Sequence, residues 1–333
     1  MAKSETNWVL YLQKSIDSWK SKNVVISPDI DGFLCYLLFS ELYDANLIGI
    51  YTTNTLVLFD HYDGHDALSA LWLDHDIAHS KIQSIGQHII QNKLTDPLSF
   101  RKKNSFNPNV IWSKSRENSF LGKSKDMDKY PFGTIHFLMQ GLMEDSEPQN
   151  SKAFALLAHA DSSWMNSINY SQNCKLWFGK MFNGKSRLIE EITSKKYCTK
   201  ENLLIHSNIL NNLEKLGLSQ FSSGRTFNSK LSSGWEHIKG FQTLTFNHLE
   251  DPLIYIKILN AILNYLSEIM GWKTSNVIKI NEIFKGAEIS NNPNHLFVDI
   301  SLDEWVEQSN IFSYAFIFKD KIKFTSQLEK KII

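Results

Sequence analysis

The sequence has few cysteines and no excess of either charge. Its three cysteines, Cys35, Cys174 and Cys198, lie far apart, so they form neither a disulfide framework nor a CxxC metal clip. They are typical of reduced thiols inside a cell. Lysine plus arginine and aspartate plus glutamate both number 35 among the 333 residues. This balance excludes a protein that is basic as a whole, but it is compatible with a local basic groove.

The sequence also lacks a long uninterrupted hydrophobic run. Residues 1–19 contain no apolar core and no small-residue cleavage site, so they do not resemble a secretion signal. The longest apolar-rich stretch, 253–270, is broken by polar residues such as Lys257 and Glu268. This pattern predicts an amphipathic helix and not a membrane span. We therefore expect a cytoplasmic protein that makes no membrane contact.

Short apolar runs separated by polar turns predict a sheet in the first part of the chain. Several of these runs end in aspartate or histidine, and such strands are expected to lie parallel with their carboxyl ends at one edge. The sequence thus predicts an α/β fold with a mainly parallel sheet and flanking helices. Strands are expected at residues 24–26, 47–59 (as two strands or a hairpin), 70–73 and 82–90, and helices at 5–20, 33–43, 135–143 and 185–217.

The chain is long enough for two domains of ordinary size. Serine and glycine are concentrated at residues 219–234, which predicts a linker. We therefore predict a metal-binding domain over 1–218 and a smaller C-terminal α+β domain over 235–333 that contacts substrate or a partner. In the second domain a helix is expected at 252–272, and strands at 277–280, 296–300, 311–318 and 322–325.

Four aspartates directly follow apolar segments. Asp29 and Asp31 stand in the turn SPDIDG, between the strand at 24–26 and the helix after it. Asp74 follows the next compact apolar run, and Asp161 is expected at a further strand end because it follows FALLA. As turn and cap residues, Asp29 and Asp31 alone would need no metal. Together with Asp74 and Asp161 they favour a shared site.

Carboxylates gathered in one crevice repel one another unless a cation lies between them. Oxygen ligands with an imidazole suit Mn²⁺ or Mg²⁺ better than a thiolate site would. We predict one or two such ions, and two ions roughly 3.5–4 Å apart could activate a water for phosphoryl transfer. The candidate ligands are Asp29, Asp31, Asp74, His75, His88 and Asp161.

The order of these motifs resembles the DHH phosphoesterase superfamily. SPDIDG after a strand, a later strand ending in aspartate, another ending in a histidine-containing triplet, and LLAHAD are similar to its four motifs, over about the first half of the chain. The resemblance implies a metal-dependent phosphodiesterase or nuclease that acts on nucleotides, short or single-stranded nucleic acid, or cyclic dinucleotides. It implies catalytic roles for Asp29, Asp31, Asp74, His88 and Asp161.

The two middle motifs can be placed in two ways. In the first, Asp60 is the second motif and Asp74-His75-Asp76 is the triplet. In the second, Asp74 is the second motif and Gly86-Gln87-His88 is a degenerate triplet that keeps only its last histidine. The second placement is favoured because it accounts for the run IQSIGQHII as a strand that ends in a histidine.

Two departures from the family pattern leave a second function open. Val25 stands where pyrophosphatases and several relatives carry a histidine, and no GGGH-type run occurs after residue 200. The first departure disfavours a pyrophosphatase, and the second leaves the substrate unspecified. The alternative is a degenerate module that binds a nucleotide or a partner protein without catalysis. A homodimer is also left open.

Overall fold

The structure is a computed structural model of the 333-residue chain. It describes residues 8–52, 54–79, 81–88, 105–112, 129–143, 148, 150–194, 199–217, 222–223, 226–231, 234–239, 243–244, 252–291, 300, 302–318, 321–326 and 328–331. Cys198 and residues 296–299 of a predicted strand lie outside these ranges, whereas Cys35 and Cys174 are buried free thiols.

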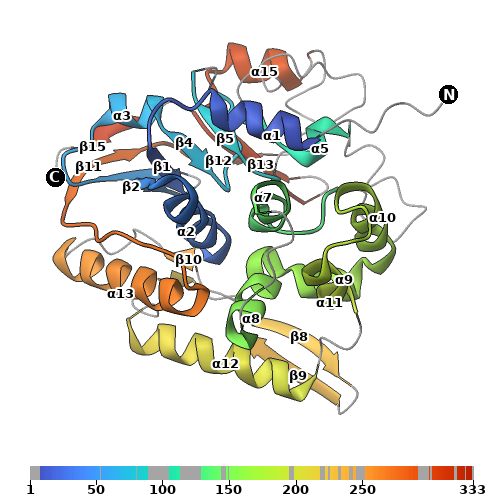
Figure 1. Ribbon diagram of the computed structural model, residues 1–333. Helices are drawn as coiled ribbons and strands as arrows, with labels where there is room; N and C mark the ends of the chain where they lie inside the picture. Colours follow the sequence, from blue (N-terminus) through green and yellow to red (C-terminus); the bar gives the residue numbers. More distant parts are fainter. Residues whose placement is uncertain are drawn as a thin grey trace.

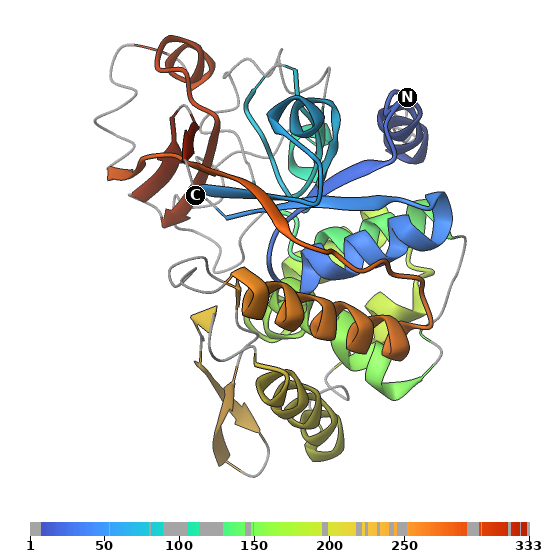
Figure 2. The same ribbon diagram turned by 90° about the vertical axis from the view of Figure 1, so that its left-hand side faces the viewer.

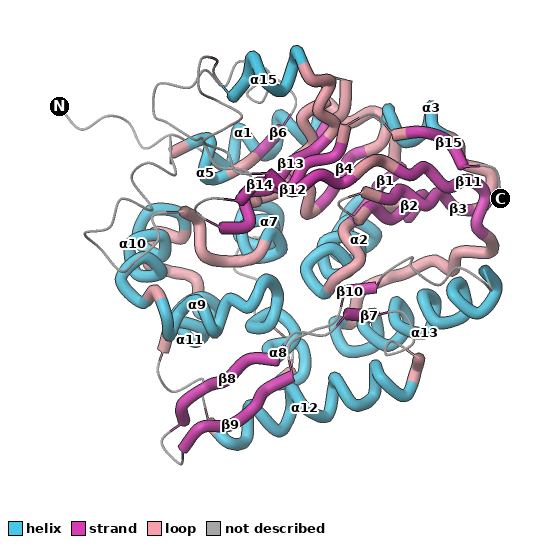
Figure 3. The backbone as a smooth tube through the Cα atoms, turned by 180° about the vertical axis from the view of Figure 1, so that it is seen from behind, coloured by secondary structure: helices cyan, strands magenta, loops and turns pink. Residues whose placement is uncertain are grey.

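A mixed sheet forms the centre of the molecule (Figures 1 and 3). Among the described residues eight strands take part, in the order β15-β11-β3-β2-β1-β4-β5-β6. The five strands from β2 to β6 in this order are parallel, and β3, β11 and β15 extend the sheet in antiparallel fashion. The strands are β1 (Asn23–Ile26), β2 (Asn46–Tyr51), β3 (Thr55–Phe59), β4 (Leu71–Leu73), β5 (Gln83–Ile85), β6 (Ser105–Phe106), β11 (Ile280–Lys285) and β15 (Glu329–Lys331).

Most helices pack in one core with one face of this sheet, which we call the first face. Figure 2 shows α2, α12 and α13 on one side of the strands, with α1 apart from them beside the N-terminus. Alternate residues of β1 divide between the two faces: Val24 and Ile26 join this core, and Val25 joins the other. The helices are α1 (Trp8–Asp17), α2 (Ile30–Tyr43), α5 (Pro108–Ile111), α7 (Thr134–Leu142), α8 (Ser151–His159), α9 (Ser163–Asn169), α10 (Ser171–Met181), α11 (Arg187–Thr193), α12 (Lys200–Lys215) and α13 (Pro252–Met270).

The second face of the sheet is covered by shorter elements. Trp72 of β4 and Phe312 pack there beside α3 (Gly64–Ser69). A separate cluster holds α15 (Leu302–Gln308) against a three-stranded antiparallel sheet. That sheet contains β12 (Glu288–Asn291), β14 (Lys321–Thr325) and β13 (Ser313–Phe318).

The strand order reverses beside β1, and this position is where an open α/β sheet binds its ligands. The chain leaves β1 through α2 to β2 on one side, and β4 pairs with β1 on the other. Loops that leave two neighbouring strands in opposite directions open a crevice at their carboxyl ends. The residues after β1 and after β4 therefore face each other across this crevice.

The structure confirms the α/β fold and the mainly parallel sheet. Residues 47–59 form the predicted pair of strands, since β2 and β3 are antiparallel neighbours. The expected strand before Asp161 is wrong, because residues 151–159 form the helix α8. Asn150 caps this helix by accepting from two backbone N–H groups, and its alanines and leucines favour a helix over a strand.

Elements from both sides of the predicted linker share one sheet. β11 pairs with β3, and β15 pairs with β11. The short strands β7 (Ser222–Ser223), β8 (Thr226–Leu231), β9 (Gly234–Lys239) and β10 (Thr243–Leu244) lie within or just after the predicted linker. The three-stranded sheet with α15 stands outside the main sheet, as do the two-stranded sheets β10-β7 and β8-β9.

By length and composition, α13 could cross a membrane. One side of the helix, which includes Leu259, Ile262 and Leu266, is buried in the main core. An amphipathic helix is what the sequence predicts for this stretch.

Candidate metal centre

Three ligand-type side chains from separate loops come together at the carboxyl edge of the parallel strands. Asp74 follows β4, His88 follows β5, and Asp161 lies in the 3-10 turn (Ala160–Ser162) between α8 and α9. One ligand atom from each lies within 4.8 Å of the other two. We call these three residues the Asp-His-Asp group.

Asp74 is the most enclosed member of the group. Its Oδ2 lies 2.5 Å from the Ser27 hydroxyl, and its Oδ1 accepts from the Thr134 hydroxyl at 2.7 Å. His88 Nε2 lies 3.2 Å from the same Oδ1. Asp74 and Asp161 both have left-handed backbones, with φ of 56° and 49°. Such conformations are uncommon outside glycine, and aspartate is among the residues that adopt them most readily.

Asp29 and Asp31 lie beside this group, at the start of α2. Asp29 caps α2 by accepting from the Gly32 N–H at 3.0 Å, and the Ser27 hydroxyl lies 2.9 Å from its Oδ1. Asp31 is buried and accepts from the N–H groups of Thr134 and Ile135, at 2.6 and 2.9 Å. Its two oxygens thus cap the N-terminus of α7, where the helix dipole favours a negative charge.

Two glycines allow the backbone to approach these carboxylates closely. A Cβ at Gly133 would lie 2.6 Å from an Asp31 oxygen, and a Cβ at Gly32 would clash with the carbonyl and hydroxyl of Ser27. Both positions therefore require glycine for steric reasons.

The buried carboxylates strongly affect one another's ionisation. Burial, followed by the charges of Asp74 and Asp161, raises the pKa of Asp29 to about 7 and the pKa of Asp31 well above its ordinary value. Burial opposes a charged His88, but Asp74 and Asp161 raise its pKa well above the ordinary value. Burial would also raise the pKa of Asp74, but His88 and its hydrogen bonds lower it. Without a metal ion, protonated His88 therefore neutralises part of the negative charge.

The raised pKa of Asp29 makes the stability of the metal-free protein depend on pH. The folded state holds this proton up to about pH 7, whereas the unfolded state loses it near 3.8. The stabilisation is therefore complete below about 3.8 and is lost as the pH rises through 7. We expect Asp29→Asn, which keeps a capping side chain, to gain stability relative to the wild type between pH 5 and 8. Urea unfolding in EDTA at several pH values measures this difference. If the free energies of unfolding of the two proteins changed with pH in the same way, the prediction would be contradicted.

Other predicted residues have different positions. The His75 ring lies edge-on to Tyr51 and Trp72, with centroids at 5.3 and 5.9 Å, and burial lowers its pKa to about 4. It is not part of the Asp-His-Asp group. Asp60 follows β3, which runs antiparallel to β2, so it lies at the opposite edge of the sheet. There it accepts from the N–H groups of Ile278 and Lys279.

Asp76 and Gln87 surround His88 instead. Asp76 accepts from the His88 N–H at 2.7 Å and from Asn107 at 2.9 Å, which fixes the loop after β5. The buried Gln87 amide donates to an Asp161 oxygen and lies 3.3 Å from His88 Nδ1. The second placement of the motifs therefore agrees with the geometry, because it assigns Asp74 and His88 to the same crevice.

Two residues that organise the centre were not among the predicted ligands. Ser27 contacts Asp29 and Asp74, and Thr134 contacts Asp31 and Asp74. The position of Ser27 directly before the SPDIDG aspartates was an available signal. For Thr134, no local pattern shows that the helix predicted at 135–143 begins beside Asp31.

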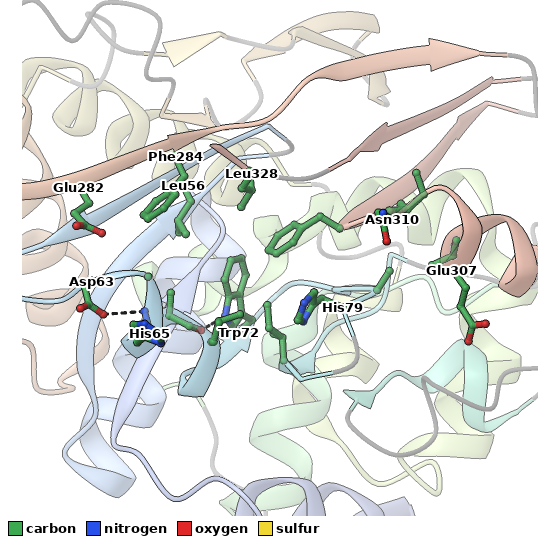
Figure 4. A pocket seen from close by; sticks show the side chains of 18 residues that line it. Leu56, Asp63, His65, Trp72, His79, Glu282, Phe284, Glu307, Asn310 and Leu328 are labelled. Atoms are coloured by element: carbon green, nitrogen blue, oxygen red, sulfur yellow. Dashed lines mark hydrogen bonds between the residues drawn. The ribbon is translucent and has the colours of Figure 1, made fainter. Parts of the chain in front are cut away.

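Two cavities lie near the sheet. One, of about 330 Å³, opens beside Gln87, His88 and Asp161. The larger one, of about 920 Å³, lies on the second face between α3, β11 and the segment after α15 (Figure 4). Its lining includes Trp72 and Phe284 and contains none of the candidate ligands. The smaller cavity is therefore the one that adjoins the Asp-His-Asp group.

Comparisons with protein-family models, with curated proteins and with solved structures find no match for this chain.

Proposed function

We propose that this chain is a divalent-metal-dependent phosphodiesterase or nuclease of the DHH type. The observation that carries the proposal is the convergence of Asp74, His88 and Asp161 within 4.8 Å at the sheet's reversal point. These residues and the adjoining Asp29 and Asp31 match the motif order that resembles that superfamily. Its proposed substrates are nucleotides, short or single-stranded nucleic acid, or cyclic dinucleotides.

The donor atoms fit a hard cation. Two carboxylates and one imidazole suit Mn²⁺ and Mg²⁺, and ligands on opposite sides of one Mg²⁺ lie about 4.2 Å apart, given bonds of about 2.1 Å. The ligand atoms of the Asp-His-Asp group lie within 4.8 Å of one another, which is compatible with this span. The mutual repulsion of Asp29, Asp31 and Asp74 supplies a further reason for a cation to bind.

Each of these residues would have a distinct role in the proposed function. Asp74, His88 and Asp161 hold the ion, and Ser27 and Thr134 fix the orientation of Asp74. A bound Mn²⁺ or Mg²⁺ supplies activation of water and stabilises charge on phosphoryl oxygens. Asp31 joins this edge of the sheet to α7 and holds Thr134 in place.

The test is hydrolysis by the purified protein. Short single-stranded oligonucleotides, linear dinucleotides and cyclic dinucleotides are incubated with Mn²⁺, and the products are separated by chromatography. Turnover that stops on chelation and returns with added Mn²⁺ supports the proposal. A lack of turnover across the whole panel contradicts the catalytic function.

A specific contact favours a second candidate, a module that binds a nucleotide or partner without catalysis. Gln87 stands where the resemblance expects a histidine, and its amide occupies an oxygen of Asp161. In this case the three-stranded sheet with α15 is the proposed partner domain. A cytoplasmic location and a homodimer stay predictions. Metal analysis separates the candidates, because a tightly held ion favours the enzyme and no ion after Mn²⁺ soaking favours the module.

Replacing Gln87 tests whether this residue limits the number of ions. We expect Gln87→His to release Asp161 Oδ2, to add an imidazole and to increase the bound Mn²⁺ from one ion to two per chain. Mn²⁺ binding followed by electron paramagnetic resonance gives the count. Gln87→Met is the matched control, because it removes the amide without adding a ligand. If the wild type and Gln87→His bound the same number of Mn²⁺ ions per chain, Gln87 would not limit that number.

A further inference from the structure

The cavity of about 330 Å³ continues directly from the Asp-His-Asp group. His88 and Asp161 form one of its walls, and the segment Lys129–Phe132 and residues of α9 and α10 form the others. A substrate group in this cavity would therefore lie next to an ion held by His88 and Asp161. Its volume is at the low end of the roughly 300–1,000 Å³ typical of small-molecule sites.

Lys129 supplies a positive charge to this cavity. Within the described part of the chain, its ammonium makes no hydrogen bond and no ion pair. Burial lowers the pKa of Lys129, and the charge of Asp161 acts in the opposite direction. An anion in the cavity would likewise favour the charged form of Lys129.

The segment that carries Lys129 is fixed by side-chain amides. Asn173 Nδ2 donates to the Lys129 carbonyl, and Asn166 Nδ2 donates to the Pro131 carbonyl, both at 2.7 Å. Asn109 Oδ1 accepts from the Tyr130 N–H at 2.6 Å. Each amide comes from a different helix, so Lys129 extends from a backbone that is held on three sides. A preorganised cation of this kind binds an anion without the entropy loss of ordering a loop.

We propose that Lys129 and this cavity bind a phosphate group of the substrate, next to the metal centre. This inference rests on the proposed function and specifies its substrate class: a small phosphate ester, or the phosphorylated end of a single strand. A lysine ammonium binds phosphate oxygens as a point charge. The small cavity has room for a chain end and not for a duplex.

The test uses inorganic phosphate as the probe. Calorimetric titration into the full-length protein, with equimolar Mn²⁺ and then in EDTA, compares the wild type with Lys129→Gln. We expect phosphate affinity to fall about tenfold or more in the variant, as for the loss of a charged hydrogen bond. In the hydrolysis assay KM should rise more than kcat falls, and the affinity for Mn²⁺ should not fall, because Lys129 is not a proposed ligand of the ion.

Lys175→Gln is the matched control, because Lys175 is an exposed lysine of α10 that does not line the cavity. Equal phosphate affinities in the wild type and Lys129→Gln would overturn the inference, as would Mn²⁺-loaded wild type that binds no phosphate. If the wild type binds no Mn²⁺, the proposed function fails. The titrations in EDTA then test the inference by themselves. A lower phosphate affinity of Lys129→Gln than of the wild type supports the inference. Equal phosphate affinities, or no phosphate binding by either protein, overturn it.

Discussion

Replacing Asp161 with asparagine should weaken Mn²⁺ binding by roughly 100-fold or more and abolish hydrolysis. Losing a partner that only orients a ligand costs about 10–100-fold in metal affinity, and losing an anionic ligand is expected to cost at least as much. Asparagine keeps the size of the side chain and tolerates the left-handed backbone at this position. The measured change therefore reports the lost charge and not a rearranged loop.

Asp44→Asn is a matched control for this variant. Asp44 also has a left-handed backbone, with φ of 51°, but its side chain is 72% exposed and pairs with Lys22 at the surface. We expect its Mn²⁺ affinity to equal that of the wild type. Calorimetry of the three proteins measures the affinities. An Asp161→Asn protein that is folded and binds Mn²⁺ as tightly as the wild type would remove Asp161 from the metal centre.

Asp31→Ala should destabilise the protein by about 2–4 kcal/mol, whether or not a metal is bound. The change leaves the buried N–H groups of Thr134 and Ile135 without their acceptor, and each such group costs about 1–3 kcal/mol. Urea unfolding at pH 7, with circular dichroism as the signal, measures the loss.

Two further variants define the origin of this effect. Asp31→Asn keeps one acceptor oxygen, so this variant should lose less stability than Asp31→Ala. Asp63→Ala removes the partly buried cap of α3 and should cost about 1 kcal/mol, the usual value for a helix cap. If Asp31→Ala were no more destabilising than Asp63→Ala, Asp31 would not join the sheet to α7 as described.

Local patterns were sufficient to predict the elements that carry the first residues of the candidate metal centre. The β-branched run at residues 24–26 and the apolar helix after Gly32 predicted β1 and α2, with Asp29 and Asp31 between them. The compact run before Asp74 predicted β4. These elements form from neighbouring residues, so hydrophobic periodicity and turn residues are enough to locate them.

The remaining contacts depend on tertiary structure. Asp161 reaches the site from the end of a helix through a left-handed kink, which the apolar run FALLA does not distinguish from a strand end. Thr134 lies 103 residues from Asp31 in the sequence and contacts it only because α7 packs beside α2. The reversed direction of β3 takes Asp60 to the opposite edge, and strand pairing of this kind is set by the whole sheet.

Anomalous X-ray diffraction from crystals soaked in Mn²⁺ tests the metal centre most directly. We expect an anomalous peak within bonding distance of Asp74, His88 and Asp161, at the carboxyl ends of β4 and β5. The same peak should be absent from crystals of Asp161→Asn. Soaked wild-type crystals with no peak at this position, or with a peak only beside Asp60 at the opposite edge of the sheet, would contradict the assignment.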